Sequence, residues 1–390
     1  MSIDNQLNSL IQTITDEYTI RNDNFPIRDP QNTARLDVLV NDFIDLISAS
    51  ISDDWQADKT IVQNAKNIIN KPLFVCGTMR SGSTMLVELL DSHPNLVVLP
   101  GDTHYINNVN RNFTSWGQDE TSIRRHWLRR FMNPKGQHPF WTLGEKPDLY
   151  IEFSQYLTYW YQQLPSTPQG NFQSVILAFY CSNPSRVPHP NFWISKTPGD
   201  ELYIEQILEH FPTARFIHIL RNPGDTVASW YKLAQHRGWD TTAHNLAQYV
   251  AQSYDAAIMN KERYQHTYHL VKYEDILEQP NITLENLLRF INVPFDDKVL
   301  VPTINGKHTS ANSQYKSIIS SGEIIQREPN TWIEKLGTEA YLIDLETRSL
   351  AEKLGYDWKT TPAISEQLSN HRQKQTKPSP IKQFLKRFKR

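Results

Sequence analysis

The sequence predicts an α/β protein: a three-layer α/β/α fold with a parallel, P-loop-like sheet and one helical insertion. Two observations favour this class. Residues 71–90 encode a buried strand, a glycine-containing turn and a helix, and three more short apolar segments follow with helical stretches between them. Ligands of such folds bind at the carboxyl ends of the strands, so the residues directly after each strand are the candidates for function.

The first strand and its turn are the clearest element. Leu73–Cys76 is an apolar run of strand formers, and apolar residues recur at helical spacing from Met85 onward. The turn at residues 77–84 reads GTMRSGST. Its glycines let backbone N–H groups approach a ligand, and its hydroxyls stand where the helix begins. The turn therefore predicts an anion site, and phosphate is the usual anion.

The composition of the turn argues against two common nucleotides. An ATP or GTP loop reads G-x-x-x-x-G-K-[ST], but Ser83 stands at the position of the lysine, and the cation of this loop is Arg80. The G-x-G-x-x-G pattern of NAD-binding loops is also absent from residues 77–84.

The remaining strands are predicted at 192–195, 215–220 and 269–272. Arg221 follows the second of these, and Ser229 lies eight residues later in the next predicted helix. A guanidinium can bind a phosphate through two parallel N–H bonds, and a serine hydroxyl can add a third contact. The pair is thus a second candidate phosphate site.

We predict three regions. Residues 1–70 form an N-terminal helical extension whose amphipathic part, 36–46, we expect to pack beside the first strand. Residues 71–358 form the main domain. Residues 359–390 form a basic tail that we expect to be flexible.

Within the main domain, residues 103–190 are dense in aromatic side chains and predict a mostly helical insertion. Four arginines lie about one helical turn apart in it: Arg124, Arg125, Arg129 and Arg130. They form either a solvated helix face or a docking patch for an acidic acceptor.

The overall composition sets further limits. The net charge of −2 over 390 residues gives no case for nucleic-acid binding. No apolar run approaches the ~18 residues that span a bilayer, and the first residues are polar, so we expect a cytoplasmic protein. The two cysteines make a disulfide framework implausible, and no metal-ligand motif is present, so we expect no metal.

The motifs together resemble those of sulfotransferases that use 3′-phosphoadenosine 5′-phosphosulfate (PAPS). Residues 90–94 resemble the L-D-x-H-P segment of the bacterial, Golgi and tyrosylprotein branches, and the suspected branch is the bacterial three-motif or tyrosylprotein-like one. The resemblance covers about 71–358. It implies that the 5′-phosphosulfate is bound by Arg80, Ser81, Gly82, Ser83 and Thr84.

The same resemblance implies further donor contacts. Arg221 and Ser229 match the residues that bind the 3′-phosphate, although Asn222 replaces a more frequent aspartate. Tyr273, in a Y-E-D segment, matches a tyrosine near the adenosine. A looser match at 305–313 makes Lys307 and Ser313 candidates in a loop that closes over the donor.

Sulfuryl transfer needs a base for the acceptor and positive charge for the leaving phosphate. The resemblance places the base at Asp102, where the family has glutamate; because aspartate is one methylene shorter, His104 is the alternative base. It assigns the leaving group to Lys196, at the end of a strand, together with Arg80.

These motifs predict a PAPS-dependent sulfotransferase that acts on a hydroxyl or amine, with PAP as the product. The cytoplasmic setting and the insertion favour a small-molecule acceptor. Two alternatives remain: a P-loop kinase or NTPase, and a non-catalytic protein that binds PAP.

Overall fold

The computed structural model describes residues 3–23, 30–132, 141–308, 332–336 and 339–357. Its centre is a five-stranded parallel sheet with the strand order β2-β3-β1-β4-β5. The strands are β1 (Pro72–Cys76), β2 (Leu96–Asp102), β3 (Phe192–Lys196), β4 (Arg215–Leu220) and β5 (Tyr268–Lys272). The predicted α/β class, with a parallel sheet flanked by helices, is confirmed.

Strand β3 lies between β1 and β2 and places two candidate site residues opposite each other. It pairs in parallel with β1 on one side and with β2 on the other. The register on the β2 side shifts between Val98 and Asp102, so that Asp102 lies opposite Lys196. All five residues of β1 are buried, as expected for a parallel strand covered on both faces.

The chain divides into two compact units. The first comprises residues 1–76, 84–217 and 279–324, and the second comprises 77–83, 218–278 and 325–390. The division of the chain at 70 and 358 that the sequence suggests stays a prediction.

The helices of the first unit enclose an aromatic core. They are α1 (Ile3–Asp23), α2 (Pro30–Ala49), α3 (Lys59–Lys66), α4 (Ser83–Asp91), α5 (Tyr105–Asn110), α6 (Glu120–Met132), α7 (Pro147–Gln163), α8 (Pro168–Ser182), η1 (Asp200–Tyr203), α9 (Ile204–His210), α13 (Pro280–Phe290) and η2 (Asp297–Leu300). A short hairpin, β6 (Thr303–Ile304) and β7 (Lys307–His308), follows them.

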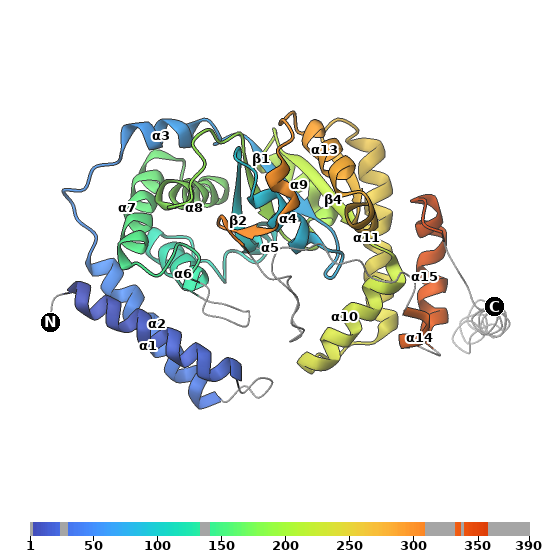
Figure 1. Cartoon of the computed structure of the whole chain (residues 1–390), viewed down its shortest axis with the longest axis horizontal. Helices are drawn as coiled ribbons and strands as arrows, with labels where there is room; N and C mark the ends of the chain where they lie inside the picture. Colours follow the sequence, from blue (N-terminus) through green and yellow to red (C-terminus); the bar gives the residue numbers. More distant parts are fainter. Residues whose placement is uncertain (1–2, 24–29, 133–140, 309–331, 337–338, 358–390) are drawn as a thin grey trace, which may run out of the picture. The chain divides into compact units, whose positions relative to one another are not determined.

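Most of the described residues in 103–190 belong to the helices α5 to α8. Its aromatic side chains pack on one another: the Phe131 ring lies 4.9 Å from that of Phe153 and 5.6 Å from that of Phe179. Trp127 and Trp160 are completely buried. These rings form the core of the unit, and α7 and α8 lie side by side within it (Figure 1).

The expectation that residues 36–46 pack beside the first strand is wrong. Helix α2, which contains them, packs mainly against α1, α6 and α7 (Figure 1). Its apolar face contributes Phe43, whose ring lies 5.8 Å from Trp141 and 5.6 Å from Tyr150. The amphipathic pattern identified the buried face, but it did not identify the neighbouring element.

The second unit is built on three packed helices, α10 (Pro223–Arg237), α11 (Ala243–Arg263) and α15 (Ala340–Lys353) (Figure 1). Two short helices complete it: α12 (Tyr273–Glu278) and α14 (Trp332–Leu336). Trp332 is buried over Gly224, where a Cβ would lie 2.2 Å from the indole. Among the described helices of both units, none is long and apolar enough to cross a bilayer.

Candidate functional site

The turn after β1 needs glycine at two positions. Gly77 has a φ of 128° and Gly82 a φ of 102°, in the region that side chains disfavour. A Cβ at Gly77 would lie 2.4 Å from the carbonyl oxygen of Ile219, and one at Gly82 would lie 2.4 Å from the ring of Tyr273. The turn therefore lies against the end of β4 and against Tyr273 without space for side chains.

Two of the predicted donor residues hold the turn itself. The hydroxyl of Ser81 donates to the carbonyl of Thr78 over 2.8 Å, and the Ser81 N–H donates to the same oxygen over 3.2 Å. Ser83 is buried and is the first residue of α4. The N–H groups of the first helical turn have no partner within the helix, so they can meet an anion.

The two predicted phosphate sites converge in the second unit. Nε of Arg80 donates to Oγ of Ser229 over 3.1 Å. Nη1 of Arg221 donates to the carbonyl oxygen of Arg80, also over 3.1 Å. The Arg221 guanidinium also lies over the ring of Tyr273, 4.8 Å from its centroid. Four residues that the sequence suggested for donor binding therefore lie within contact distance of one another.

A network of hydrogen bonds surrounds the backbone at Arg221. The N–H of Asn222 donates to Oε1 of Glu274 over 2.8 Å, and the Tyr356 hydroxyl lies 3.3 Å from Oε2 of the same carboxylate. The hydroxyl of Tyr254 donates to the Arg221 carbonyl. Burial raises the pKa of Glu274, and the hydrogen bond from Asn222 opposes that rise. The network fixes the peptide that carries the guanidinium.

A second cluster of predicted residues lies in the first unit. The ammonium of Lys196, at the end of β3, forms an ion pair with the carboxylate of Asp102, at the end of β2. It also donates to Oγ1 of Thr84 over 3.0 Å. The Lys196 side chain is 5% exposed and that of Asp102 is 36% exposed, so the base candidate is the accessible member of the pair.

The charges in this cluster are arranged around Lys196. Burial acts to raise the pKa of Asp102, but the neighbouring Lys196 ammonium outweighs it, and the pKa is lowered. Burial raises the pKa of Glu88, on α4, to about 8, although Lys196 acts to lower it. At neutral pH Glu88 is therefore mostly protonated, and Asp102 is the ionised partner of Lys196.

His104 begins α5 with a φ of 55°. Its backbone N–H donates to Oγ1 of Thr197 over 2.9 Å. Thr103, next to it, bonds through its hydroxyl to Ser195 at 2.6 Å and to Thr197 at 3.1 Å. These buried hydroxyls tie the ends of β2 and β3 together, and the charge of His104 acts to lower the pKa of Asp102.

Three of the four arginines of the α6 cluster have carboxylate partners. Arg124 pairs with Glu120, Arg125 with Asp45 and Arg129 with Asp37. The last two pairs join α6 to α2.

Arg130, the fourth arginine of the cluster, makes a different contact. Its Nη2 donates to the carbonyl oxygen of Asp102, and its guanidinium lies over the Trp127 ring, 5.1 Å from the centroid. A Cβ at Gly101 would lie 3.1 Å from Nη2. A tryptophan three residues before an arginine on a helix is a signal of such stacking, because residues i and i+3 share a face.

Asp91, in the L-D-x-H-P segment, anchors the β6–β7 hairpin. Its Oδ2 accepts hydrogen bonds from Oγ1 of Thr303 at 2.7 Å and from the N–H of Gly306 at 3.0 Å. Burial raises the pKa of Asp91 to about 6, although these hydrogen bonds act to lower it.

His93 has a matching structural role. Its Nδ1 accepts from the N–H of Asn95 at 3.1 Å, so the proton is on Nε2, which donates to the Pro294 carbonyl at 2.9 Å. Burial lowers the pKa of His93, which favours this neutral form.

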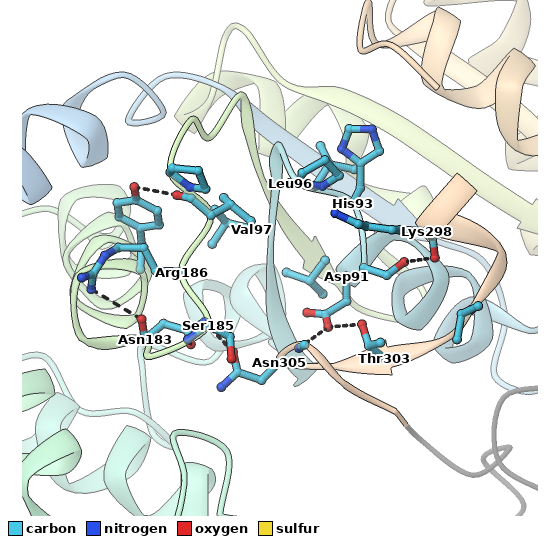
Figure 2. A pocket seen from close by; sticks show the side chains of 18 of the residues that line it. Asp91, His93, Leu96, Val97, Asn183, Ser185, Arg186, Lys298, Thr303 and Asn305 are labelled. Carbon is cyan, nitrogen blue, oxygen red and sulfur yellow. Dashed lines mark hydrogen bonds between the residues drawn. The ribbon is translucent and has the colours of Figure 1, made fainter. Parts of the chain in front are cut away.

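A cavity of about 430 Å³ lies beside Asp91, between strand residues 96–98, the segment 183–188 and the hairpin (Figure 2). In Figure 2 Asp91 faces Thr303 and Asn305 across one end of this cavity. None of the residues predicted for the donor, the base or the leaving group lines it.

Two predictions are left without support from contacts. Lys307 is exposed on β7, and Ser313 lies outside the described residues. In the part of the chain that the structure describes, no group of three or more His, Cys, Asp or Glu side chains could hold a metal.

A family model described as "Sulfotransferase family" matches residues 72–297. An uncharacterized protein of Aquifex aeolicus (strain VF5) is 23% identical over 284 residues, which are 66% of this chain and 32% of that protein. This chain therefore spans about a third of the length of that relative.

Two solved structures are similar in fold. The sulfotransferase domain of the Synechococcus PCC 7002 olefin synthase is 20% identical, with a TM-score of 0.43 over 79% of this chain and 100% of that domain. Sulfotransferase STF9 from Mycobacterium avium is 18% identical, with a TM-score of 0.40 over 74% of this chain and 78% of that chain.

Proposed function

Because the chain belongs to the sulfotransferase family, we propose that it transfers a sulfuryl group from PAPS to a hydroxyl or amine of a small molecule. The convergence of Arg80, Arg221 and Ser229 is the observation that supports this most. Two guanidinium groups and a hydroxyl suit a nucleotide with phosphate groups at two positions. The bacterial three-motif or tyrosylprotein-like branch remains part of the proposal.

The residues of the turn fit the donor. The glycines bring backbone N–H groups within reach of a phosphosulfate, and Arg80 supplies the charge that a lysine supplies in NTP-binding loops. Arg80 lies in the turn, and Thr84 is the second residue of the helix that follows it. We propose that the cluster around Arg221 binds the nucleotide, and that the one around Lys196 carries the chemistry.

The transfer needs one proton acceptor and one cation. The acceptor oxygen or nitrogen forms a bond to sulfur while the bond from sulfur to the bridging oxygen breaks, and that electron pair leaves with PAP. Asp102, ionised at neutral pH, takes the acceptor proton. Lys196, held by Asp102 and Thr84, meets the negative charge that grows on the leaving phosphate, together with Arg80.

Asp102 is the better of the two base candidates. Its carboxylate pairs with Lys196 and is partly exposed, so it is ionised and accessible. His104 is the alternative, and its charge already acts on Asp102. The cytoplasmic location and the role of the helical region in acceptor binding remain parts of the proposal.

Transfer of label tests the proposal. Purified protein is incubated with PAPS labelled in the sulfuryl group and with pools of phenols, alcohols and amines, and PAP binding is measured separately by calorimetry. We expect label in an acceptor and PAP binding without metal. Magnesium-dependent ATP hydrolysis without PAP binding would support the kinase or NTPase instead. PAP binding without transfer to any acceptor would support a non-catalytic protein.

A further inference from the structure

Arg130 has an arrangement that its neighbours on α6 do not share. Arg124, Arg125 and Arg129 each pair with a carboxylate, whereas Arg130 has no carboxylate in hydrogen-bond contact among the described residues. Its single acceptor there is the backbone carbonyl of Asp102, on Nη2. A guanidinium has five N–H donors, and one of them, on Nη2, donates to an acceptor among the described residues.

One of the other donors of Arg130 is shielded from solvent. Nε of Arg130 is buried without an acceptor, within the part of the chain described. Burial lowers the pKa of Arg130 to about 10, which still leaves it charged at neutral pH. A buried donor without a partner carries a desolvation cost, and such groups call for an explanation such as a ligand.

The surroundings hold the guanidinium in place. The Trp127 ring supports one face of it, and Gly101, whose Cβ would lie 3.1 Å from Nη2, lets the guanidinium approach the backbone of β2 closely. The residue as a whole keeps partial exposure, so a small molecule can reach it. The result is a fixed cation beside the backbone of the candidate base.

We propose that Arg130 binds an anionic group of the acceptor, a carboxylate, and so selects hydroxy or amino acids over neutral alcohols and amines. This inference rests on the proposed function, since it places the reacting group of the acceptor at Asp102. Two hydrogen-bond lengths and the span of one residue separate the two groups of the acceptor by at most about 10 Å. Acceptors with a short spacing between hydroxyl and carboxylate are therefore expected.

Matched acceptors test the selection. The probes are ω-hydroxy acids of three to eight carbons and hydroxyphenyl carboxylates, each compared with its primary amide, which has nearly the same shape without the charge. In the wild-type enzyme we expect kcat/KM to be about 10- to 100-fold higher for the acid than for the amide. In Arg130→Gln this ratio should fall to about one, because the acid loses its cationic partner and the amide does not.

Two further variants make the result specific. Arg129→Gln is the matched control, because Arg129 lies next to Arg130 but binds Asp37 at 2.5 Å and Asn41 at 2.8 Å. It should leave the ratio unchanged. Arg130→Lys keeps the charge without the planar fork and should restore part of the preference. Thermal unfolding shows whether Arg130→Gln folds. If it does not, the acid-to-amide ratio of kcat/KM in Arg130→Lys, compared with that of the wild type, tests the role of Arg130.

The outcomes separate this inference from the proposed function. Absence of PAP binding to the wild type would defeat the proposed function itself. PAP binding with equal use of acid and amide, or a preference that survives in Arg130→Gln, would overturn only the role of Arg130. Calorimetry can also measure the affinity of the enzyme–PAP complex for the acid and for its amide, without turnover. Equal affinities would overturn the role of Arg130.

Discussion

Nε of Arg80 donates a hydrogen bond to Oγ of Ser229 over 3.1 Å, although 149 residues separate the two in sequence. Arg80 does this from a backbone φ of 71°, a conformation that costs a residue other than glycine about 1–2 kcal/mol. Strain of this kind is found mostly at functional sites. The contact therefore links the loop after β1 to helix α10 at the candidate nucleotide site.

Replacement of Ser229 by alanine should weaken the binding of PAP but not that of AMP, which lacks the 3′-phosphate. A hydrogen bond to a charged phosphate is worth about 1.5–3 kcal/mol, so we expect the Kd of PAP to rise about 10- to 100-fold. Calorimetry with both nucleotides measures this. Gln235→Ala, on the exposed side of the same helix, is the control. An equal loss for PAP and AMP would show that Ser229 does not contact the 3′-phosphate.

Gly82→Ala should damage both the turn and nucleotide binding. The new Cβ would lie 2.4 Å from the Tyr273 ring, so the ring must move, and with it the surface on which Arg221 stacks. The φ of 102° adds strain on the order of 1 kcal/mol.

Gly238→Ala provides the control for that strain. Gly238 also has a positive φ, 65°, but nothing lies within 4 Å of its Cβ position. Thermal unfolding should show a loss in both variants, whereas PAP binding should fall only in Gly82→Ala. Normal PAP affinity in Gly82→Ala would mean that the close approach of Tyr273 has no part in the site.

Strands β1, β3, β4 and β5 were predictable because burial leaves a strong pattern. Strand β4 begins at Arg215 and ends at Leu220, as the sequence suggested, since a parallel strand covered on both faces reads as a continuous apolar run. The residues after each strand followed from topology, which brings the carboxyl ends of strands to one edge of the sheet. Lys196 and Asp102 are an example, and the register of β2 on β3 places them opposite each other.

The position of Arg130 could not be predicted in the same way. Four arginines within seven residues identify a basic helix, but neither charge nor periodicity says which of them reaches α2 and which reaches β2. The decisive features are the acids at positions 37 and 45 of α2 and the absence of a side chain at Gly101. These relationships depend on the packing of α2 against α6, which the sequence pattern did not reveal.

The pH dependence of kcat/KM should identify the base. Because the pKa of Asp102 is lowered below its ordinary value, Asp102 stays ionised as the pH falls, and activity should be constant from neutral pH down to about 5. If a histidine were the base, activity would instead fall as its imidazole is protonated; the pKa of histidine in model peptides is about 6.5.

Two variants complete that measurement. Asp102→Asn should reduce kcat by about 100-fold or more, while His104→Gln should retain most activity and the same flat acid limb. The profile is recorded with saturating PAPS after the folding of each variant has been checked by circular dichroism. An active Asp102→Asn enzyme whose rate follows a group near pH 6.5 would transfer the role to His104.

Asp91 should make the protein less stable as the pH rises from about 4 to about 6. The pKa of its carboxyl is raised to about 6 in the folded state, so over that interval the folded protein binds a proton that the unfolded chain has released, and unfolding becomes easier until the pH passes 6. The effect on the free energy of unfolding is at most about 3 kcal/mol.

In Asp91→Asn this part of the pH dependence should vanish, because the amide oxygen can still accept hydrogen bonds from Thr303 and Gly306 but carries no charge. Asp91→Ala should also remove those hydrogen bonds, cost about 1–3 kcal/mol and expose the Gly306 amide to hydrogen exchange. Urea unfolding at several pH values measures the difference from the wild type, which cancels the separate titration of Glu88 near pH 8 to first order. The exposed Asp53→Asn serves as the control. A slope that persists unchanged in Asp91→Asn would show that the charge of Asp91 is not the cause.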